Sequence, residues 1–153
     1  MEIDFLFIGK TKEKYLLEGI NDFNKRLGHY CRTNIKIIKE KKGKLSSEER
    51  MREEGRLIIN NIADKSYVVL LDRSGKEISS KDLARKLDNW KLNHRKITII
   101  VGGYLGVSRE VVSAADYVMS LSKMTFTHEL ARVLIIEQMY RAFSILAGSQ
   151  YHK

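Results

Sequence analysis

The sequence predicts an α/β fold in which a mostly parallel sheet carries helices on both faces. Short runs rich in Val, Ile and Leu alternate with longer amphipathic segments, as in sheets whose strands are buried on both sides. The chain has 153 residues, 43% of them hydrophobic, which is enough for one sizeable core. It contains no proline, internal repeat or low-complexity segment that would suggest a linker. We therefore expect a single domain over residues 1–153.

Five buried strands and five helices are expected in alternation. The strands are runs of β-branched and aliphatic residues at 3–8, 34–40, 66–72, 96–103 and 116–122. The helices are expected at 12–27, 47–62, 79–92, 108–115 and 127–147. Ser46 with Glu49, and Ser79 with Asp82, have the spacing of capping boxes at two helix starts. Residues 73–76 (RSGK) are expected to turn the chain out of the third strand.

The last predicted helix is apolar on more than one stripe. Its apolar residues are Leu130, Val133, Leu134, Ile135, Ile136, Met139, Tyr140, Phe143, Ile145 and Leu146. One face of a sheet cannot cover all of them, so we expect a homodimer in which a second copy covers the remainder. The alternative is that the helix lies deep within the monomer.

The chain is basic. Its 28 Lys and Arg residues exceed its 19 Asp and Glu residues, giving a formal charge of +9 and a pI of about 9.6. A surplus of this size favours a polyanionic partner, because each neutralised phosphate releases counterions. Nucleic acid is the natural candidate, and the alternative is that the charge only maintains solubility.

A cytoplasmic location is expected. No apolar run approaches the roughly 20 residues of a membrane-spanning helix, so no membrane partner is expected. The acidic start at residues 1–4 is unlike a signal peptide. Cys31 is the only cysteine, which excludes an intrachain disulfide and a cysteine-based zinc site.

A glycine motif at residues 101–106 (VGGYLG) ends the fourth predicted strand. Parallel sheets bind ligands at the carboxyl ends of their strands, where glycine lets the backbone approach a ligand closely. A tight turn would explain the glycines equally well. The spacing is not that of GxGxxG, and no GxxxxGK[ST] sequence occurs. Dinucleotide-binding and Walker-type sites are therefore excluded.

The third and fifth predicted strands end near the same place, in Asp72 and Ser122. Small and apolar side chains with accessible backbone suit an adenosine better than a triphosphate. The sequence shows no carboxylate pair, Ser-His-Asp order or metal-ligand spacing. Its four histidines, at 29, 94, 128 and 152, are scattered. Hydrolytic and metal chemistry are therefore not expected, and no metal ligands are predicted.

Four blocks of sequence resemble the ribosomal RNA large subunit methyltransferase H family, which belongs to the SPOUT class. They are Gly102-Gly103-x-x-Gly106, Leu121-Ser122-Lys123-Met124-Thr125-Phe126-x-His128, Arg132-Val133 with Glu137-Gln138-x-Tyr140-Arg141-Ala142-Phe143, and Tyr151-His152-Lys153. The opening IGKTKEKY and the KRL at 25–27 extend the resemblance over essentially the whole chain. Thr127 departs from the pattern, because the family commonly has proline there. The entry to the last helix is therefore expected to be less rigid.

The resemblance implies a C-terminal trefoil knot (an α/β knot) and S-adenosylmethionine as cofactor, held in the knot loops. It implies that residues 121–126 cross the cofactor site and do not form a failed helix start. The cofactor-binding residues that it implies are Leu71, Gly102, Leu121, Ser122, Lys123, Met124, Thr125 and Phe126. The implied reaction is methylation of N3 of a pseudouridine in 23S rRNA, with the large ribosomal subunit or the assembled ribosome as partner.

The resemblance also suggests roles for the C-terminal residues. His152 is the first candidate for removing the N3 proton, and His128 the second. Arg132 and Arg141 are candidates for holding a phosphate or the negative charge that develops on the ring. Substrate contacts are expected from Tyr151, His152, Lys153 and His128. The alternatives without a functional role are that Arg141 only forms an ion pair with Glu137 and that the terminus is disordered.

Two other functions fit the same residues. A non-catalytic basic RNA-binding or ribosome-associated domain with this fold would lack S-adenosylmethionine binding. A small-molecule nucleotide enzyme would gain nothing from the positive charge, and its activity would be insensitive to salt.

Overall fold

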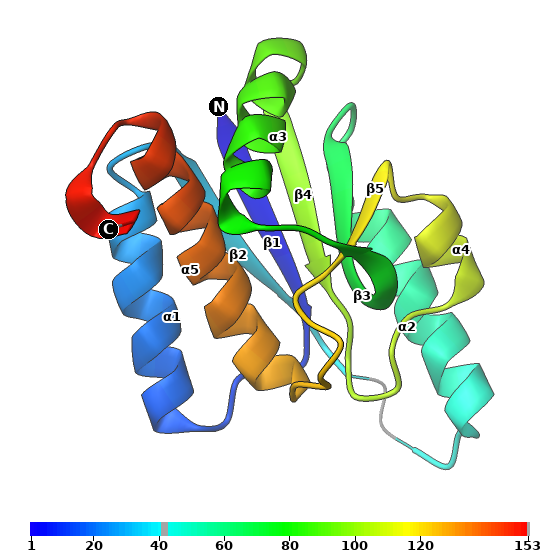
Figure 1. The fold of residues 1–153 in the computed structure, drawn as a ribbon. Coiled ribbons are helices and arrows are strands. Elements are labelled where there is room, and N and C mark those ends of the chain that lie inside the picture. The colour runs from blue at the N-terminus through cyan, green and yellow to red at the C-terminus, as the bar shows by residue number, and fades with distance from the viewer. Residues whose placement is uncertain (41–42, 153) are drawn as a thin grey trace.

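Five parallel strands form one sheet in the computed structural model, which describes residues 1–40 and 43–152 (Figure 1). The strand order is β2-β1-β4-β3-β5, and all four neighbouring pairs are parallel. The strands are β1 (Glu2–Ile8), β2 (Arg32–Ile38), β3 (Tyr67–Glu77), β4 (Lys96–Val101) and β5 (Tyr117–Ser120). The predicted α/β class with a parallel sheet is confirmed.

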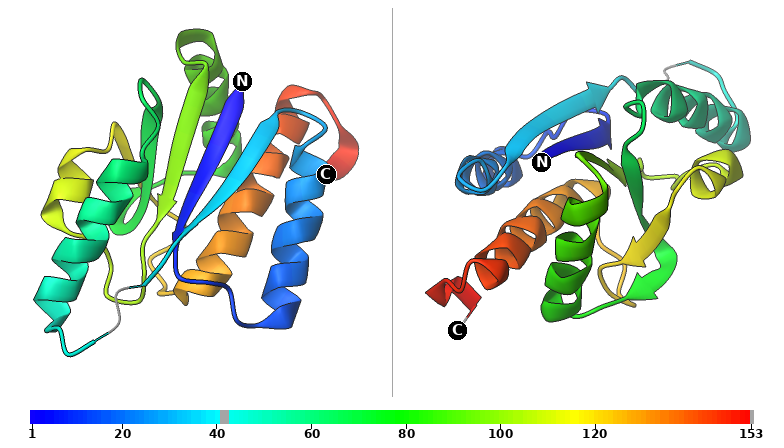
Figure 2. Two further views of the ribbon diagram at one scale, coloured as in Figure 1. Left: turned by 180° about the vertical axis from the view of Figure 1, so that it is seen from behind. Right: turned by 90° about the horizontal axis from the view of Figure 1, so that it is seen from above.

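Helices cover both faces of the sheet, as predicted (Figures 1 and 2). One face carries α1 (Lys14–Leu27), α3 (Ser80–Asn93) and α5 (His128–Leu146). The other carries α2 (Ser47–Asn61) and α4 (Arg109–Ser113), and a short 3-10 turn, η1 (Gln150–His152), follows α5. Both predicted capping boxes are present, at the starts of α2 and α3. No helix in the described parts of the chain is long and apolar enough to cross a bilayer.

The packing of α5 accounts for much of its apolar surface. The helix lies between α1 and α3 against the sheet (Figure 1). Its buried apolar residues are Ile135, Ile136, Met139, Ala142 and Phe143. Burial within the monomer, the alternative that the sequence left open, thus explains these five. Leu130 and Leu134 are only partly buried and belong to neither core cluster. The apolar stripe on α5 that a second copy of the chain would have to cover is therefore narrower than the sequence suggested.

The prediction that residues 73–76 turn the chain out of the third strand was wrong, because β3 continues to Glu77. Met119 of β5 pairs with Leu71 and again with Lys76, so the intervening residues bulge out and β3 then resumes. Asp72 Oδ1 accepts a hydrogen bond from the Ser74 backbone N–H at 2.9 Å, a turn signal that also occurs inside bulges. Gly75 permits the return, because a Cβ there would lie 2.6 Å from the Met119 backbone.

Candidate active site

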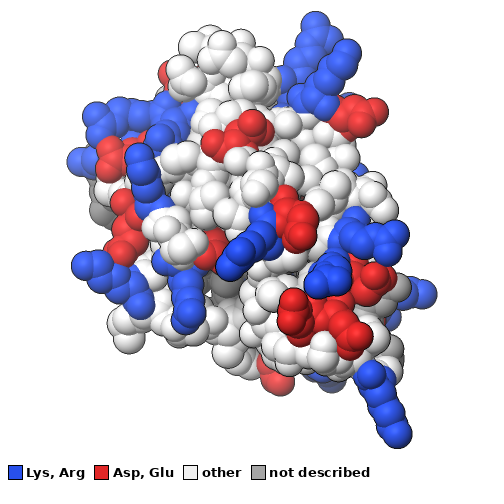
Figure 3. Space-filling view, turned by 90° about the vertical axis from the view of Figure 1, so that its right-hand side faces the viewer, with Lys and Arg blue, Asp and Glu red and all other residues white. Residues whose placement is uncertain are grey.

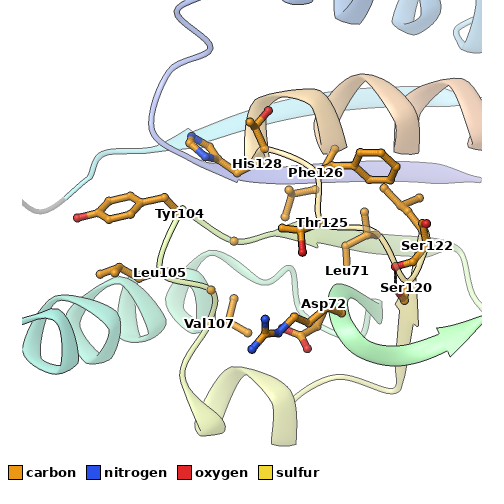
Figure 4. A pocket seen from close by; sticks show the side chains of 18 of the residues that line it. Leu71, Asp72, Tyr104, Leu105, Val107, Ser120, Ser122, Thr125, Phe126 and His128 are labelled. Atoms are coloured by element: carbon orange, nitrogen blue, oxygen red, sulfur yellow. Dashed lines mark hydrogen bonds between the residues drawn. The ribbon is translucent and has the colours of Figure 1, made fainter.

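A pocket of about 810 Å³ lies at the carboxyl ends of β4 and β5 and beside the bulge in β3 (Figure 4). Three segments line it: the β3 bulge at 71–73, the end of β4 and its following loop at 101–107, and the chain from 119 to 131 that leads from β5 into α5, except Lys123 and residues 129–130. This is the edge where open parallel sheets bind ligands. The sequence predicted that three strands end at this cleft; β4 and β5 do end there, whereas β3 contributes its bulge and continues to Glu77.

The glycine loop is a tight turn closed on itself. The Gly106 N–H donates to the Gly103 carbonyl at 3.0 Å, and Gly106 has φ of 85°, a conformation that favours glycine. A Cβ on Gly102 would lie 2.7 Å from Val107 Cγ1 and 3.0 Å from the Gly106 carbonyl oxygen. The turn itself therefore requires glycine at 102. The sequence offered a tight turn and a ligand-binding loop as explanations of the glycine motif. Both apply, since the tight turn also lines the pocket.

The segment from Leu121 to Thr127 is ordered by short-range hydrogen bonds. Ser120 Oγ donates to the Ser122 carbonyl at 2.9 Å, and Ser122 Oγ accepts from the Met124 N–H at 3.0 Å. Thr127 Oγ1 accepts from the Leu130 N–H at 3.3 Å and caps α5. Threonine therefore fixes the helix start through its side chain.

Seven of the eight predicted cofactor residues line the pocket, namely Leu71, Gly102, Leu121, Ser122, Met124, Thr125 and Phe126. Lys123 is exposed and is not one of the lining residues. The sequence placed Asp72, Met119 and Ser120 at the cleft through their strands but did not name them as binding residues. Arg73, Tyr104, Leu105 and Val107 were not named as binding residues either. The signal for Tyr104 and Leu105 was their place inside the glycine motif, whereas Val107 carried none.

His128, the first residue of α5, lines the pocket, and its side chain is partly buried. Burial, and secondly the positive charge of Arg132, lower the pKa of the His128 imidazole below its ordinary value. The negative charges of Glu129 and Glu40 act in the opposite direction but do not reverse the shift of the pKa. The imidazole is therefore neutral near pH 7 and able to accept a proton.

Arg132 is completely buried and lies outside the pocket lining. Its guanidinium donates to the Ile8 carbonyl at the end of β1 and, at 2.9 Å, to Thr11 Oγ1. One turn earlier on α5, Glu129 accepts from the backbone N–H groups of Lys12 and Glu13 at the start of α1. Together these two side chains attach the entry of α5 to the β1–α1 connection.

The C-terminal tail folds back on α5. Tyr151 Oη donates to Glu137 Oε1 at 3.1 Å, and the Arg141 guanidinium lies 4.6 Å from the centre of the Tyr151 ring. Arg141 is also paired with Glu137 at 2.7 Å. The ion pair that the sequence offered as an alternative to a substrate-binding role of Arg141 is therefore present. The predictions for the side chain of His152 and for Lys153 lie outside the described residues.

The pocket lining is mostly uncharged. Asp72 and Arg73 are the charged side chains among its lining residues, and His128 is neutral. Within residues 1–40 and 43–152, no three His, Cys, Asp or Glu side chains are placed to share a metal ion. The arrangement suits a ligand that is held by backbone groups and apolar walls.

A model of the family described as "Predicted SPOUT methyltransferase" matches residues 1–152. The fold and the pocket are thus those of a SPOUT-class methyltransferase. Ribosomal RNA large subunit methyltransferase H of Clostridium botulinum strain Kyoto is 43% identical over 159 residues, and that of Desulfotalea psychrophila is 41% identical over 156; each match covers all of both chains. The chain belongs to the ribosomal RNA large subunit methyltransferase H family.

Solved structures share the fold at low sequence identity. The tRNA (m1G37) methyltransferase from Aquifex aeolicus has a TM-score of 0.55 and 17% identity, covering 92% of this chain and 70% of its own. A probable methylase family protein from Haemophilus influenzae has a TM-score of 0.52 and 15% identity, covering 95% and 66%. These neighbours support the SPOUT fold, while the trefoil knot itself stays a prediction.

Proposed function

We propose that this protein methylates N3 of a pseudouridine in 23S rRNA of the large ribosomal subunit, using S-adenosylmethionine, as a single cytoplasmic domain. The observation that carries the proposal is the pocket at the ends of β4 and β5 and the bulge of β3, which is lined by seven of the eight residues that the family pattern implied. Full-length relatives named for large-subunit rRNA methylation support the substrate class.

The pocket fits an adenosine-containing cofactor. Leu71, Leu121 and Phe126 provide apolar walls, while the glycine turn from Gly102 to Gly106 lines the pocket without bulky side chains at its three glycines. A volume of about 810 Å³ is within the range of small-molecule sites. When bound, S-adenosylmethionine supplies an electrophilic methyl group on a sulfonium. The residues of the chain must then hold the uracil-type ring in line and remove the proton from its N3.

The proposed roles of the polar residues follow from where each lies. His128 is in the pocket and neutral, so it can accept a proton there; His152 on the tail is the other candidate base. The contacts of Arg132 support a role in positioning, because its guanidinium holds the turn after β1. Arg141 lies beside the tail, so if Arg141 contacts a substrate phosphate, Tyr151 contacts the substrate next to it.

The tail cannot reach the pocket of its own chain in the observed conformation. His128 at one end of α5 and Arg141 beside the tail are 13 residues apart, or about 20 Å along a helix. We therefore propose a homodimer in which the tail of one copy closes over the pocket of the other. Leu130 and Leu134, partly buried on the outside of α5, are the proposed contact stripe.

The positive charge agrees with an RNA substrate but does not identify the contact surface. On the side shown in Figure 3, Lys and Arg side chains are scattered among Asp and Glu and form no continuous patch. The salt dependence of binding would measure how many of them contact phosphate.

The deciding experiment measures methyl transfer to 23S rRNA with and without its pseudouridines, supplied as free RNA, large subunits and ribosomes. We expect transfer only to the pseudouridine-containing substrate. Calorimetry with a chelator present should show S-adenosylmethionine binding, and Gly102→Val should weaken it by displacing Val107. Failure to bind S-adenosylmethionine would favour the non-catalytic RNA-binding function, and transfer to unmodified uridine would refute the pseudouridine specificity.

A further inference from the structure

Tyr104 is an exposed aromatic residue at the rim of the pocket. It occupies, with Leu105, the centre of the turn that the Gly106-to-Gly103 hydrogen bond closes. Its side chain lines the pocket and is nevertheless 63% exposed. Figure 4 shows the ring directed away from Leu71, Ser120 and Ser122, which lie on the far side of the pocket.

The fold gives no reason for an aromatic residue at this position. Tyr67, Tyr117, Tyr140 and Tyr151 each lie tilted or edge-on against another aromatic ring. Within the described chain, Tyr104 makes no ring contact and no side-chain hydrogen bond, and it belongs to neither core cluster. Any residue compatible with the turn would leave the packing unchanged.

The position of the ring suits contact with RNA better than contact with the cofactor. The apolar side chains suited to an adenine lie at the inner wall, on β3 and the segment after β5. A target base must leave its stack to enter such a pocket, so the neighbouring nucleotides must be splayed across the rim. An exposed aromatic face there provides a stacking surface for one of them.

We propose that Tyr104 stacks on an unpaired base next to the target nucleotide in the rRNA. This inference rests on the proposed function. It makes Tyr104 a substrate-binding residue whose ring, and not its hydroxyl, provides the contact. The effect falls on RNA binding and not on the chemical step, because the ring contacts the substrate both before and during methyl transfer.

The test compares Tyr104→Ala and Tyr104→Phe with Tyr15→Ala. Tyr15 is a matched control, because it is 69% exposed, is on α1 and does not line the pocket. With the rRNA form that the unmodified protein methylates best, Tyr104→Ala should raise KM about 5- to 150-fold, the range of aromatic–base stacking. Its kcat at saturating RNA should be unchanged. Tyr104→Phe and Tyr15→Ala should behave like the unmodified protein.

Two further measurements separate this contact from other roles of the ring. The affinity for S-adenosylmethionine by calorimetry and the sedimentation coefficient should be unchanged in Tyr104→Ala. Weaker cofactor binding, a change in oligomeric state, an unchanged KM, or an equal loss in Tyr15→Ala would each overturn the inference. If the unmodified protein methylates no rRNA, the proposed function itself fails; an unchanged KM in an active enzyme refutes only the stacking contact.

Discussion

Tyr151 and Glu137 are joined by a hydrogen bond of 3.1 Å from the phenol to the carboxylate. Burial, and secondly the charge of Glu137, raise the pKa of the Tyr151 phenol, so the phenol remains a donor at neutral pH. The same carboxylate pairs with Arg141, whose guanidinium lies over the Tyr151 ring. The tail is thus held on the outer surface of α5 by contacts that do not involve the pocket.

The first prediction is that removing residues 151–153 abolishes methyl transfer and spares cofactor binding. The tail contacts α5 far from the pocket, so its loss leaves the pocket walls in place. Transfer of a labelled methyl group to rRNA and calorimetry with S-adenosylmethionine measure the two effects. His152→Ala should lower kcat more than it raises KM for RNA. A truncated chain that methylates normally would show that the tail is dispensable, and one that loses cofactor affinity would show a structural role.

The second prediction concerns self-association through α5. Leu134→Glu places a charge on the partly buried stripe and should convert the proposed dimer to a monomer of 17.7 kDa, because burying an unpaired carboxylate in an interface is unfavourable. Leu92→Glu, at a residue 82% exposed on α3, is the matched control and should remain dimeric. Sedimentation at micromolar concentration distinguishes the two. A monomeric unmodified chain would refute the dimer and leave Leu130 and Leu134 without an explanation.

The periodicity of the sequence predicted most of the fold. Each strand and helix depends on a local pattern, such as the Ser46–Glu49 and Ser79–Asp82 capping boxes, which the structure confirms. Patterns of this kind depend on neighbours three or four residues apart. The bulge in β3 was missed because residues 73–76 carry ordinary turn signals, and only the second pairing with Met119 shows that the strand resumes.

The candidate site was predicted less completely, for a physical reason. The family pattern marked Arg132, but the partners of its guanidinium are at Ile8 and Thr11, more than 120 residues earlier in the chain. No spacing in the sequence indicates such a contact. The role of Tyr104 could not be predicted for a different reason, because its exposure at the rim of the pocket depends on the three-dimensional path of the glycine turn.

The third prediction tests the cap at Thr127. Thr127→Ala removes the hydrogen bond to the Leu130 N–H and should lower the free energy of unfolding by about 0.5–2 kcal/mol. Ser79→Ala removes the corresponding bond at the start of α3, outside the pocket lining, and should destabilise by a similar amount. Only Thr127→Ala should also weaken S-adenosylmethionine binding, because Thr127 lines the pocket. Equal cofactor affinities in the two variants would show that the cap has no effect on the site.

The last prediction concerns the dependence of stability on pH at His128. Burial and the charge of Arg132 place the pKa of its imidazole in the folded protein below the ordinary value of about 6.5. The unfolded chain therefore binds this proton more readily, and unfolding becomes easier as protons are added. The contribution of His128 to stability is full above about pH 6.5 and is lost as the pH falls through the pKa of the folded state.

His128→Gln keeps a polar side chain of similar size but cannot titrate in this range. We expect the urea midpoint of the unmodified protein to fall more than that of His128→Gln when the pH is lowered from about 7.5 to about 5, a range that spans the reference pKa of about 6.5. The carboxylates that titrate at lower pH are common to both proteins and cancel in the difference. A parallel fall in the two proteins would mean that the imidazole is as easily protonated in the folded chain as in the unfolded one, and the argument for a neutral base in the pocket would fail with it.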